Sequence, residues 1–99
     1  MDKLDQIKSL ILHDQVDYSQ KVQEQLEEDL FAEQDLAHSI LTATRIYKRE
    51  RDEKAQAADG YKYTILGKDT HGHPFYSAGK ILKDHLGNYY FFITAHASD

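Results

Sequence analysis

The sequence predicts an α+β domain in which two or three N-terminal helices pack on one face of a four-stranded, mostly antiparallel sheet. Two observations lead to this fold class. Residues 1–43 repeat their apolar side chains at helical spacing, whereas residues 61–96 read as three strands with a period of two. Turn signals at 71–74 and 85–88 separate these strands and indicate an antiparallel meander.

Size and composition indicate one folded domain covering residues 1–99. The chain is 40% hydrophobic, which is enough for a single core built from two packed layers. The absence of cysteine excludes disulfides, thiolate zinc sites and thiol catalysis, and it fits a reducing cytoplasm. No apolar run approaches membrane-spanning length, and the charged N-terminus is unlike a signal peptide. We therefore expect a cytoplasmic protein that does not contact a membrane.

The net charge of -5 is unevenly distributed along the chain. Residues 1–43 hold three Lys against ten Asp or Glu, a net of -7, whereas residues 44–99 hold nine Lys or Arg against seven acidic residues, a net of +2. The predicted helices are therefore acidic and the predicted sheet is mildly basic. This asymmetry fits either a merely solvated acidic surface or a protein with one face that accepts nucleic acid.

A narrow apolar stripe predicts a first helix from Met1 to Leu12. Its members recur at helical spacing: Leu4, Ile7, Leu10 and Ile11. Two interpretations fit so narrow a stripe. The helix docks on the core, or residues 1–14 are an appendage that pairs with a second copy and makes a homodimer.

Two further helices are expected before the sheet. Tyr18, Val22, Leu26 and Leu30 recur every four residues and predict a helix from about Tyr18 to Asp29, with Asp17 as its N-cap. A third helix begins near Ala32, where acidic side chains favour the first turn, and ends near Thr42. We expect residues 16–99 to combine these helices with the meander.

The strands are predicted from composition and alternation. The charged segment from Thr44 to Arg51 suits an edge strand, and residues 52–60 form a polar, mobile loop. In the meander we take one alternating set of side chains as the face beneath the helices: Tyr61, Tyr63, Ile65, Phe75, Ser77, Gly79, Ile81, Tyr89, Phe91, Ile93 and Ala95. The small residues Ser77 and Gly79 would leave room for a crossing helix.

Three segments carry a family resemblance: VDYSQKVQEQLEEDLFAEQDLAHSILTATRIYKRER, DGYKYTILGKDTHGHPFYSAGKILKD and NYYFFITAHA. Their order resembles a bacterial family of short domains of unknown function, close in shape to the RelE, BrnT and MqsR toxins. Members show an opening turn, a helix of the form His-Ala-x-x-Arg-Met-x-x-Arg and a meander ending in Val-Ile-Thr-Val-Tyr. The resemblance implies a RelE-like fold and a toxin–antitoxin context, with RNA cleavage that needs no metal or other cofactor.

The chain departs from that family where the family helix is basic. The His, Arg and Arg of the family helix correspond here to Lys21, Gln25 and Asp29. A copy without those residues is expected to be a degenerate relative that binds RNA or a protein partner. The alternatives are an interaction or dimerisation module without nucleic-acid binding, and an active metal-independent endoribonuclease.

The sheet face turned away from the helices is the candidate functional surface. Lysines suit phosphate contacts and tyrosines suit base stacking, so the expected RNA-binding residues are Lys62, Tyr76 and Lys80, joined by Arg45 and Arg49 if these point the same way. The candidate catalytic residues are His96 and Tyr90. Histidine has an ordinary pKa of about 6.5, which suits general acid–base catalysis.

Metal binding is not expected. His71 and His73 could share an ion, but zinc needs three or four ligands and His85 lies at the far end of the same strand. The Gly and Pro between and after the two histidines suit a hairpin turn instead. The acidic run from Glu24 to Asp29 is interpreted as a solvated helix face. The sequence also lacks phosphate-loop, nucleophile-elbow and dinucleotide motifs.

Overall fold

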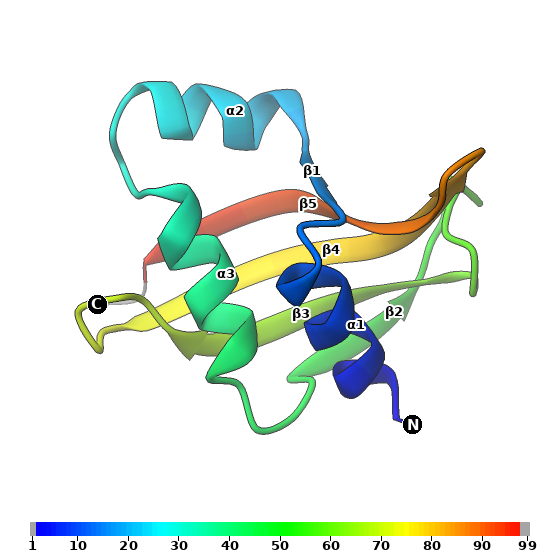
Figure 1. Cartoon of the computed structure of the whole chain (residues 1–99), viewed down its shortest axis with the longest axis horizontal. Helices are drawn as coiled ribbons and strands as arrows, with labels where there is room; N and C mark the ends of the chain where they lie inside the picture. Colours follow the sequence, from blue (N-terminus) through cyan, green and yellow to red (C-terminus); the bar gives the residue numbers. More distant parts are fainter. Residues whose placement is uncertain (1, 98–99) are drawn as a thin grey trace.

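The computed structural model describes residues 2–97. The elements follow the chain in the order α1 (Lys3–Leu12), β1 (Val16–Tyr18), α2 (Gln20–Glu27), α3 (Glu33–Leu41), β2 (Lys48–Arg51), β3 (Tyr61–Lys68), β4 (Pro74–Asp84) and β5 (Gly87–Ala97). The predicted α+β class, with helices and a sheet, is confirmed. Figure 1 shows α1 and α3 in front of the sheet, with α2 along the side formed by β1 and β5.

The sheet has five strands in the order β1-β5-β4-β3-β2. Strands β2 to β5 pair antiparallel, whereas β1 lies parallel to β5 and places Val16 opposite Tyr90. The prediction of a four-stranded, mostly antiparallel sheet is therefore wrong in strand number, because the parallel strand β1 adds a fifth strand at one edge. The charged strand β2 does form the other edge, as expected, although only the last four residues of the predicted segment are extended.

The second helix begins later than its apolar spacing predicts. Asp17 and Tyr18 belong to β1, where they pair with Phe91 and Phe92. The chain can turn into a helix only after it leaves this strand, so Ser19 rather than Asp17 caps α2 and accepts a hydrogen bond from the N–H of Val22. The third helix matches its prediction to within one residue at each end.

The first helix is part of the core. The four residues of its apolar stripe, Leu4, Ile7, Leu10 and Ile11, are all buried against side chains of α3 and the sheet. This packing agrees with the first of the two interpretations, in which the helix docks on the core, and pairing with a second copy stays a prediction. The helix is observed from Lys3, and Met1 lies outside the described residues.

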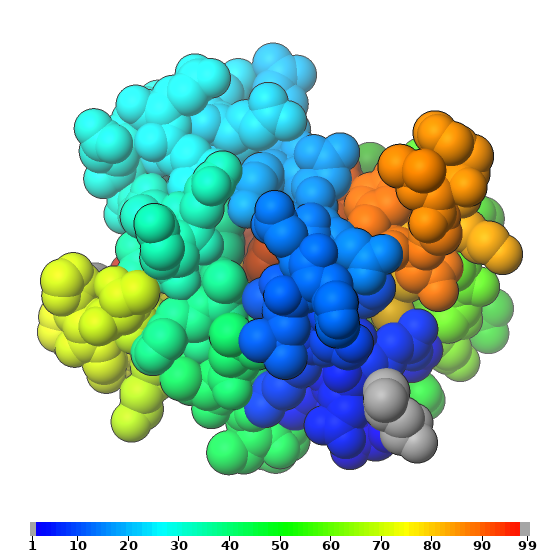
Figure 2. Space-filling view, in the orientation of Figure 1, coloured from blue at the N-terminus to red at the C-terminus, as the bar shows by residue number. Residues whose placement is uncertain are grey.

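In Figure 2 the side chains of α1 and α3 cover most of the sheet. Among residues 2–97, none of the helices has the length and apolar character that a bilayer crossing requires.

A β-bulge in β5 changes which of its side chains face the helices. Ala78 pairs with Thr94 and Gly79 pairs with Phe92, so Ile93 has no partner on β4. Before the bulge, Tyr90 and Phe92 are buried, and after it the buried residue is Ala95. The predicted face is therefore wrong for Tyr89, Phe91 and Ile93 and right for Ala95. On β3 and β4 the predicted core set is correct, with only Tyr61 half-buried.

A close helix–sheet contact lies at Gly67 on β3, where no side chain separates the two backbones. A Cβ atom on Gly67 would overlap the carbonyl oxygen of Ser39, because α3 crosses β3 at this point. The space beside Gly79 is filled by the ring of Tyr90. The expectation that Ser77 and Gly79 make room for a helix is thus wrong at Gly79.

Candidate functional site

The sheet face turned away from the helices, here called the open face, brings four strands and one loop together. At one level across the sheet Glu50 pairs with Lys62, and Lys80 pairs with Phe91. Four residues before Lys80 on β4, Tyr76 pairs with His96. Because side chains on one face repeat every two residues, these two levels lie about 13 Å apart. The open face therefore has a basic level and an aromatic level.

The aromatic level is a row of three rings, Tyr47, Tyr76 and His96. The ring centroids of Tyr76 and His96 are 5.4 Å apart with a 33° tilt, and Tyr47 meets Tyr76 edge to face at 6.0 Å. His96 is exposed and Tyr47 is 53% exposed, so flat ring surface is available to solvent. Thr64, Ala78 and Thr94 help to line a shallow hollow of about 220 Å³ beside Tyr76 and His96. Such a row can stack against planar groups.

The basic level borders a larger hollow of about 430 Å³, here called the lysine hollow. Its floor is formed by Phe91 and Ile93, which are half-buried, and Lys62 and Lys80 stand beside them. Loop 52–60 forms one wall, and the start of α2 forms another. This is the arrangement of an apolar floor with a few convergent polar groups that is typical of ligand pockets.

Lys80 is held by loop 52–60. Its Nζ atom donates to the amide oxygen of Gln56 at 2.8 Å and contacts the two carboxylate oxygens of Asp52 at 3.4 and 3.3 Å. Lys80 is only 3% exposed and Asp52 is 7% exposed. The predicted RNA-binding lysine therefore lies on the expected face, but it is an ion-paired, buried residue and not a free surface cation.

Asp52 organises the loop that was expected to be mobile. Its carboxylate accepts hydrogen bonds from the backbone N–H groups of Lys54, Gln56 and Ala57. Burial alone would raise the pKa of Asp52, but the hydrogen bonds from Ala57, Gln56 and Lys80 outweigh it and lower the pKa to about 2. The carboxylate is thus charged at neutral pH and fixes loop 52–60 onto the open face.

Tyr90, one of the two candidate catalytic residues, lies on the opposite side of the sheet from His96. It is 0% exposed and belongs to the core beneath the helices. The bulge lies after Tyr90 in β5, so Tyr90 shares the inward face with Phe92. Burial and then the neighbouring Tyr63 raise its pKa above the ordinary value for tyrosine. The structure therefore does not bring the predicted catalytic pair together, and Tyr90 cannot contact a ligand on the open face.

Of the two arginines, Arg49 is turned away from the open face. Arg49 pairs with Tyr63, whose side chain lies under the helices, and its guanidinium stacks 4.4 Å above the ring centroid of Tyr61. Arg45 is exposed in the bend before β2. Of the predicted binding residues, Lys62, Tyr76 and Lys80 share the open face with His96. The sequence did not identify three further residues of this site, because their role depends on contacts between distant segments. These residues are Asp52, Gln56 and Phe91.

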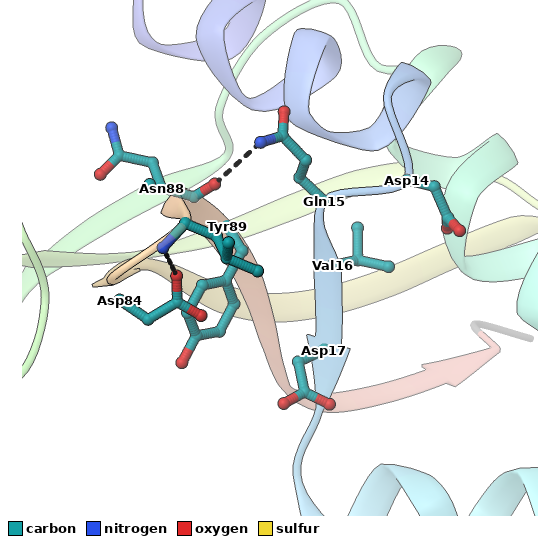
Figure 3. A pocket seen from close by; sticks show the side chains of 9 residues that line it. Asp14, Gln15, Val16, Asp17, Asp84, Asn88 and Tyr89 are labelled. Carbon is teal, nitrogen blue, oxygen red and sulfur yellow. Dashed lines mark hydrogen bonds between the residues drawn. The ribbon is translucent and has the colours of Figure 1, made fainter.

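Another hollow, of about 320 Å³, lies where β1 meets the start of β5. Figure 3 shows the carboxylates of Asp14, Asp17 and Asp84 spread around this hollow and not turned toward one point. The side-chain amide of Gln15 donates to the carbonyl of Asn88 there at 3.4 Å. Within residues 2–97 there is no group of three His, Cys, Asp or Glu side chains placed to hold a metal ion. We therefore do not identify this hollow as a metal centre.

Comparisons with known proteins give no relative. No family model, no curated protein and no solved structure matches this chain. The open face itself is thus the basis for a functional proposal.

Proposed function

We propose that this protein is a binding module that holds single-stranded RNA on its open face, as a non-catalytic relative of the RelE-like toxin ribonucleases. The observation that carries the proposal is the aromatic pair of half-buried Tyr76 and exposed His96, which shares one uncovered sheet face with Lys62. Aromatic rings accept bases by stacking, and a lysine at a neighbouring level can contact the phosphate backbone.

Charge distribution supports this location. Ten of the 17 acidic residues fall in residues 1–43, which form the helical layer and β1. On the open face two acidic neighbours of Lys62 are paired, because Glu50 contacts Lys48 at 3.5 Å and Asp52 contacts Lys80, and Glu53 is a third acidic residue at the hollow. The lysine hollow is therefore lined by three lysines against two carboxylates, although the whole chain is acidic.

The family resemblance supports a binding role over cleavage. After β1 the elements run two helices and four strands, which is the order expected of the resembling family, whereas β1 itself stands where that family has an opening turn. The chain has Lys21, Gln25 and Asp29 where that family has His, Arg and Arg. Proton transfer during RNA cleavage needs a positioned acid and a positioned base. His96 has Tyr76 beside it, but Tyr90 lies on the other side of the sheet.

Fluorescence anisotropy with a labelled, unstructured RNA oligonucleotide at two salt concentrations tests the proposal. We expect binding that weakens as salt rises, because phosphate contacts release counterions. Tyr76→Ala and His96→Ala should each weaken binding about tenfold, since base stacking contributes about 1–3 kcal/mol per base. His85→Ala is the matched control, because His85 is exposed in the turn between β4 and β5.

Three results would oppose the proposal in different ways. Absence of RNA binding would leave a protein partner as the ligand of the open face. Equal binding by Tyr76→Ala and His85→Ala would move the RNA site elsewhere on the molecule. RNA cleavage that persists with EDTA present and disappears in His96→Ala would establish an endoribonuclease instead of a binding module.

A further inference from the structure

We infer that the lysine hollow is a pocket for a nucleotide carrying a terminal phosphate, so that the protein holds the phosphorylated end of an RNA strand. This inference rests on the proposed function and specifies which part of the RNA enters which part of the open face. The volume of about 430 Å³ lies within the range of about 300–1,000 Å³ that is usual for small-molecule sites.

The floor of the hollow suits a planar base. Phe91 is half-buried on the open face, next to Ile93, which the bulge has moved onto the same face. Bases stack on phenylalanine rings irrespective of their sequence, because every base presents a π face. The wall made by loop 52–60 closes one side of this floor, which distinguishes it from the flat aromatic row at the other level.

Lys80 supplies a donor that the protein does not use completely. An ammonium group has three N–H donors. One of them is directed to Gln56, and the nearly equal distances of 3.4 and 3.3 Å to the two oxygens of Asp52 fit one donor shared between them. The remaining donor belongs to a side chain that is only 4% exposed and lines the hollow. A buried donor of this kind favours an anionic acceptor.

The charges around the hollow also favour an anion. Lys54, Lys62 and Lys80 line it, against Asp52 and Glu53. Asp52 is already saturated by three backbone N–H groups and Lys80, so its charge is compensated. A terminal phosphate carries up to two negative charges, whereas a phosphodiester carries one. The terminal group therefore gains more from this lysine set than an internal phosphate does.

The test compares four probes on the full chain by isothermal titration calorimetry: adenosine, adenosine 5′-monophosphate, tetrauridylate with a 5′-phosphate, and the same oligonucleotide with a 5′-hydroxyl. We expect the phosphorylated oligonucleotide to bind about tenfold more tightly than the hydroxyl form, as charge-assisted hydrogen bonds predict. Adenosine monophosphate should bind and adenosine should not. The mononucleotide separates binding of a free nucleotide from binding of an RNA end.

Variants assign the effect to the hollow. Lys62→Gln should remove most of the preference for the phosphate, and Phe91→Leu should weaken binding of adenosine monophosphate while keeping the apolar floor. Lys21→Gln is the charge-matched control, because Lys21 is exposed on α2. Lys62 is on a half-buried strand position outside the core cluster, so its substitution leaves the fold intact.

The outcomes separate the inference from the function on which it rests. Equal affinity for both oligonucleotides, with binding lost in Tyr76→Ala, would overturn the phosphate pocket and leave RNA binding by the open face in place. A phosphate preference that survives in Lys62→Gln and Phe91→Leu would overturn the location. Lack of binding by every probe would overturn both proposals.

Discussion

The ring of Tyr90 occupies the space in which Gly79 would carry a side chain. A Cβ atom on Gly79 would lie 2.5 Å from both the Cζ atom and the hydroxyl oxygen of Tyr90. The ring reaches diagonally across the β4–β5 ladder, because Tyr90 is paired with Ile81 and Gly79 is paired with Phe92. The glycine thus accommodates an aromatic ring of the neighbouring strand, and this packing keeps Tyr90 beneath the helices.

Removing the Tyr90 hydroxyl should leave RNA binding unchanged. It should leave the free energy of unfolding unchanged or slightly higher. The oxygen is buried and has no hydrogen-bond partner among the described residues. Tyr90→Phe therefore deletes an unsatisfied polar atom, and we expect the free energy of unfolding to stay the same or rise by about 1 kcal/mol. Urea denaturation measures this change. Loss of RNA binding by a fully folded Tyr90→Phe protein would contradict the placement of Tyr90 away from the ligand.

Gly67→Ala should destabilise the protein more than any substitution at a turn glycine. The new methyl group would overlap the carbonyl oxygen of Ser39, so α3 must move away from β3. We expect a loss of about 3 kcal/mol, at the upper end of the cost of overpacking. Gly72→Ala is the control, because its φ of 82° disfavours alanine but nothing lies within 4 Å. It should cost only about 1 kcal/mol, and a larger loss there than at Gly67 would refute the helix–sheet contact.

Asp52→Asn should weaken the fold and reduce its sensitivity to acid. Removing one partner of a buried ion pair costs about 3–5 kcal/mol, because Lys80 keeps its charge. In the wild type the pKa of Asp52 is lowered from 3.8 to about 2. A lowered pKa gives stability that is complete above about pH 4 and is lost as the pH falls toward 2.

The measurement is the free energy of unfolding between pH 5 and pH 2 by urea denaturation monitored by circular dichroism. The Asp52→Asn curve should be flatter than the wild-type curve over this window. The double variant Asp52→Asn with Lys80→Met should recover much of the lost stability at neutral pH, since it leaves no unpaired charge. Parallel curves for wild type and Asp52→Asn would show that the carboxylate is not the acid-sensitive group.

Ile7→Ala should reduce stability, because α1 belongs to the core. Ile7 is 0% exposed, and deleting a buried isoleucine to alanine costs about 2–5 kcal/mol. Leu12→Ala, at the end of the same helix, is the matched control, since Leu12 is 70% exposed and should change stability by less than about 0.5 kcal/mol. Thermal unfolding at two protein concentrations measures both. A midpoint that depends on concentration only in proteins with Ile7 would instead support pairing of α1 with a second copy.

The parts of the fold that could be predicted from sequence are those determined by local pattern. The meander was correctly located because alternation and two turn signals lie within the same forty residues. The strand β1 was missed because three residues give no periodicity, and because Tyr18 also fits the four-residue spacing of α2. Its pairing with β5 joins positions more than 70 residues apart, which no local signal encodes.

The candidate site was predictable only in outline. Alternation correctly placed Lys62, Tyr76 and His96 on the open face. This worked because β3, the start of β4 and the end of β5 alternate without interruption. The ion pair of Lys80 was not predictable, since Asp52 lies 28 residues away in a loop that resembles a solvated linker. Both faces of β5 are apolar, so its sequence did not reveal the bulge that decides the position of Tyr90.

The bulge at Ile93 divides β5 into two halves, and the alternation of inward and outward side chains is interrupted between them. Substituting a residue in the strand alters one side chain, but deleting Ile93 would restore an unbroken alternation. Phe92 and Thr94 would then be neighbours, and each would keep its partner on β4 and its present face. The loss of Ile93 would therefore remove the bulge and leave His96 on the open face, so copies of this chain with and without this residue should bind on the same face.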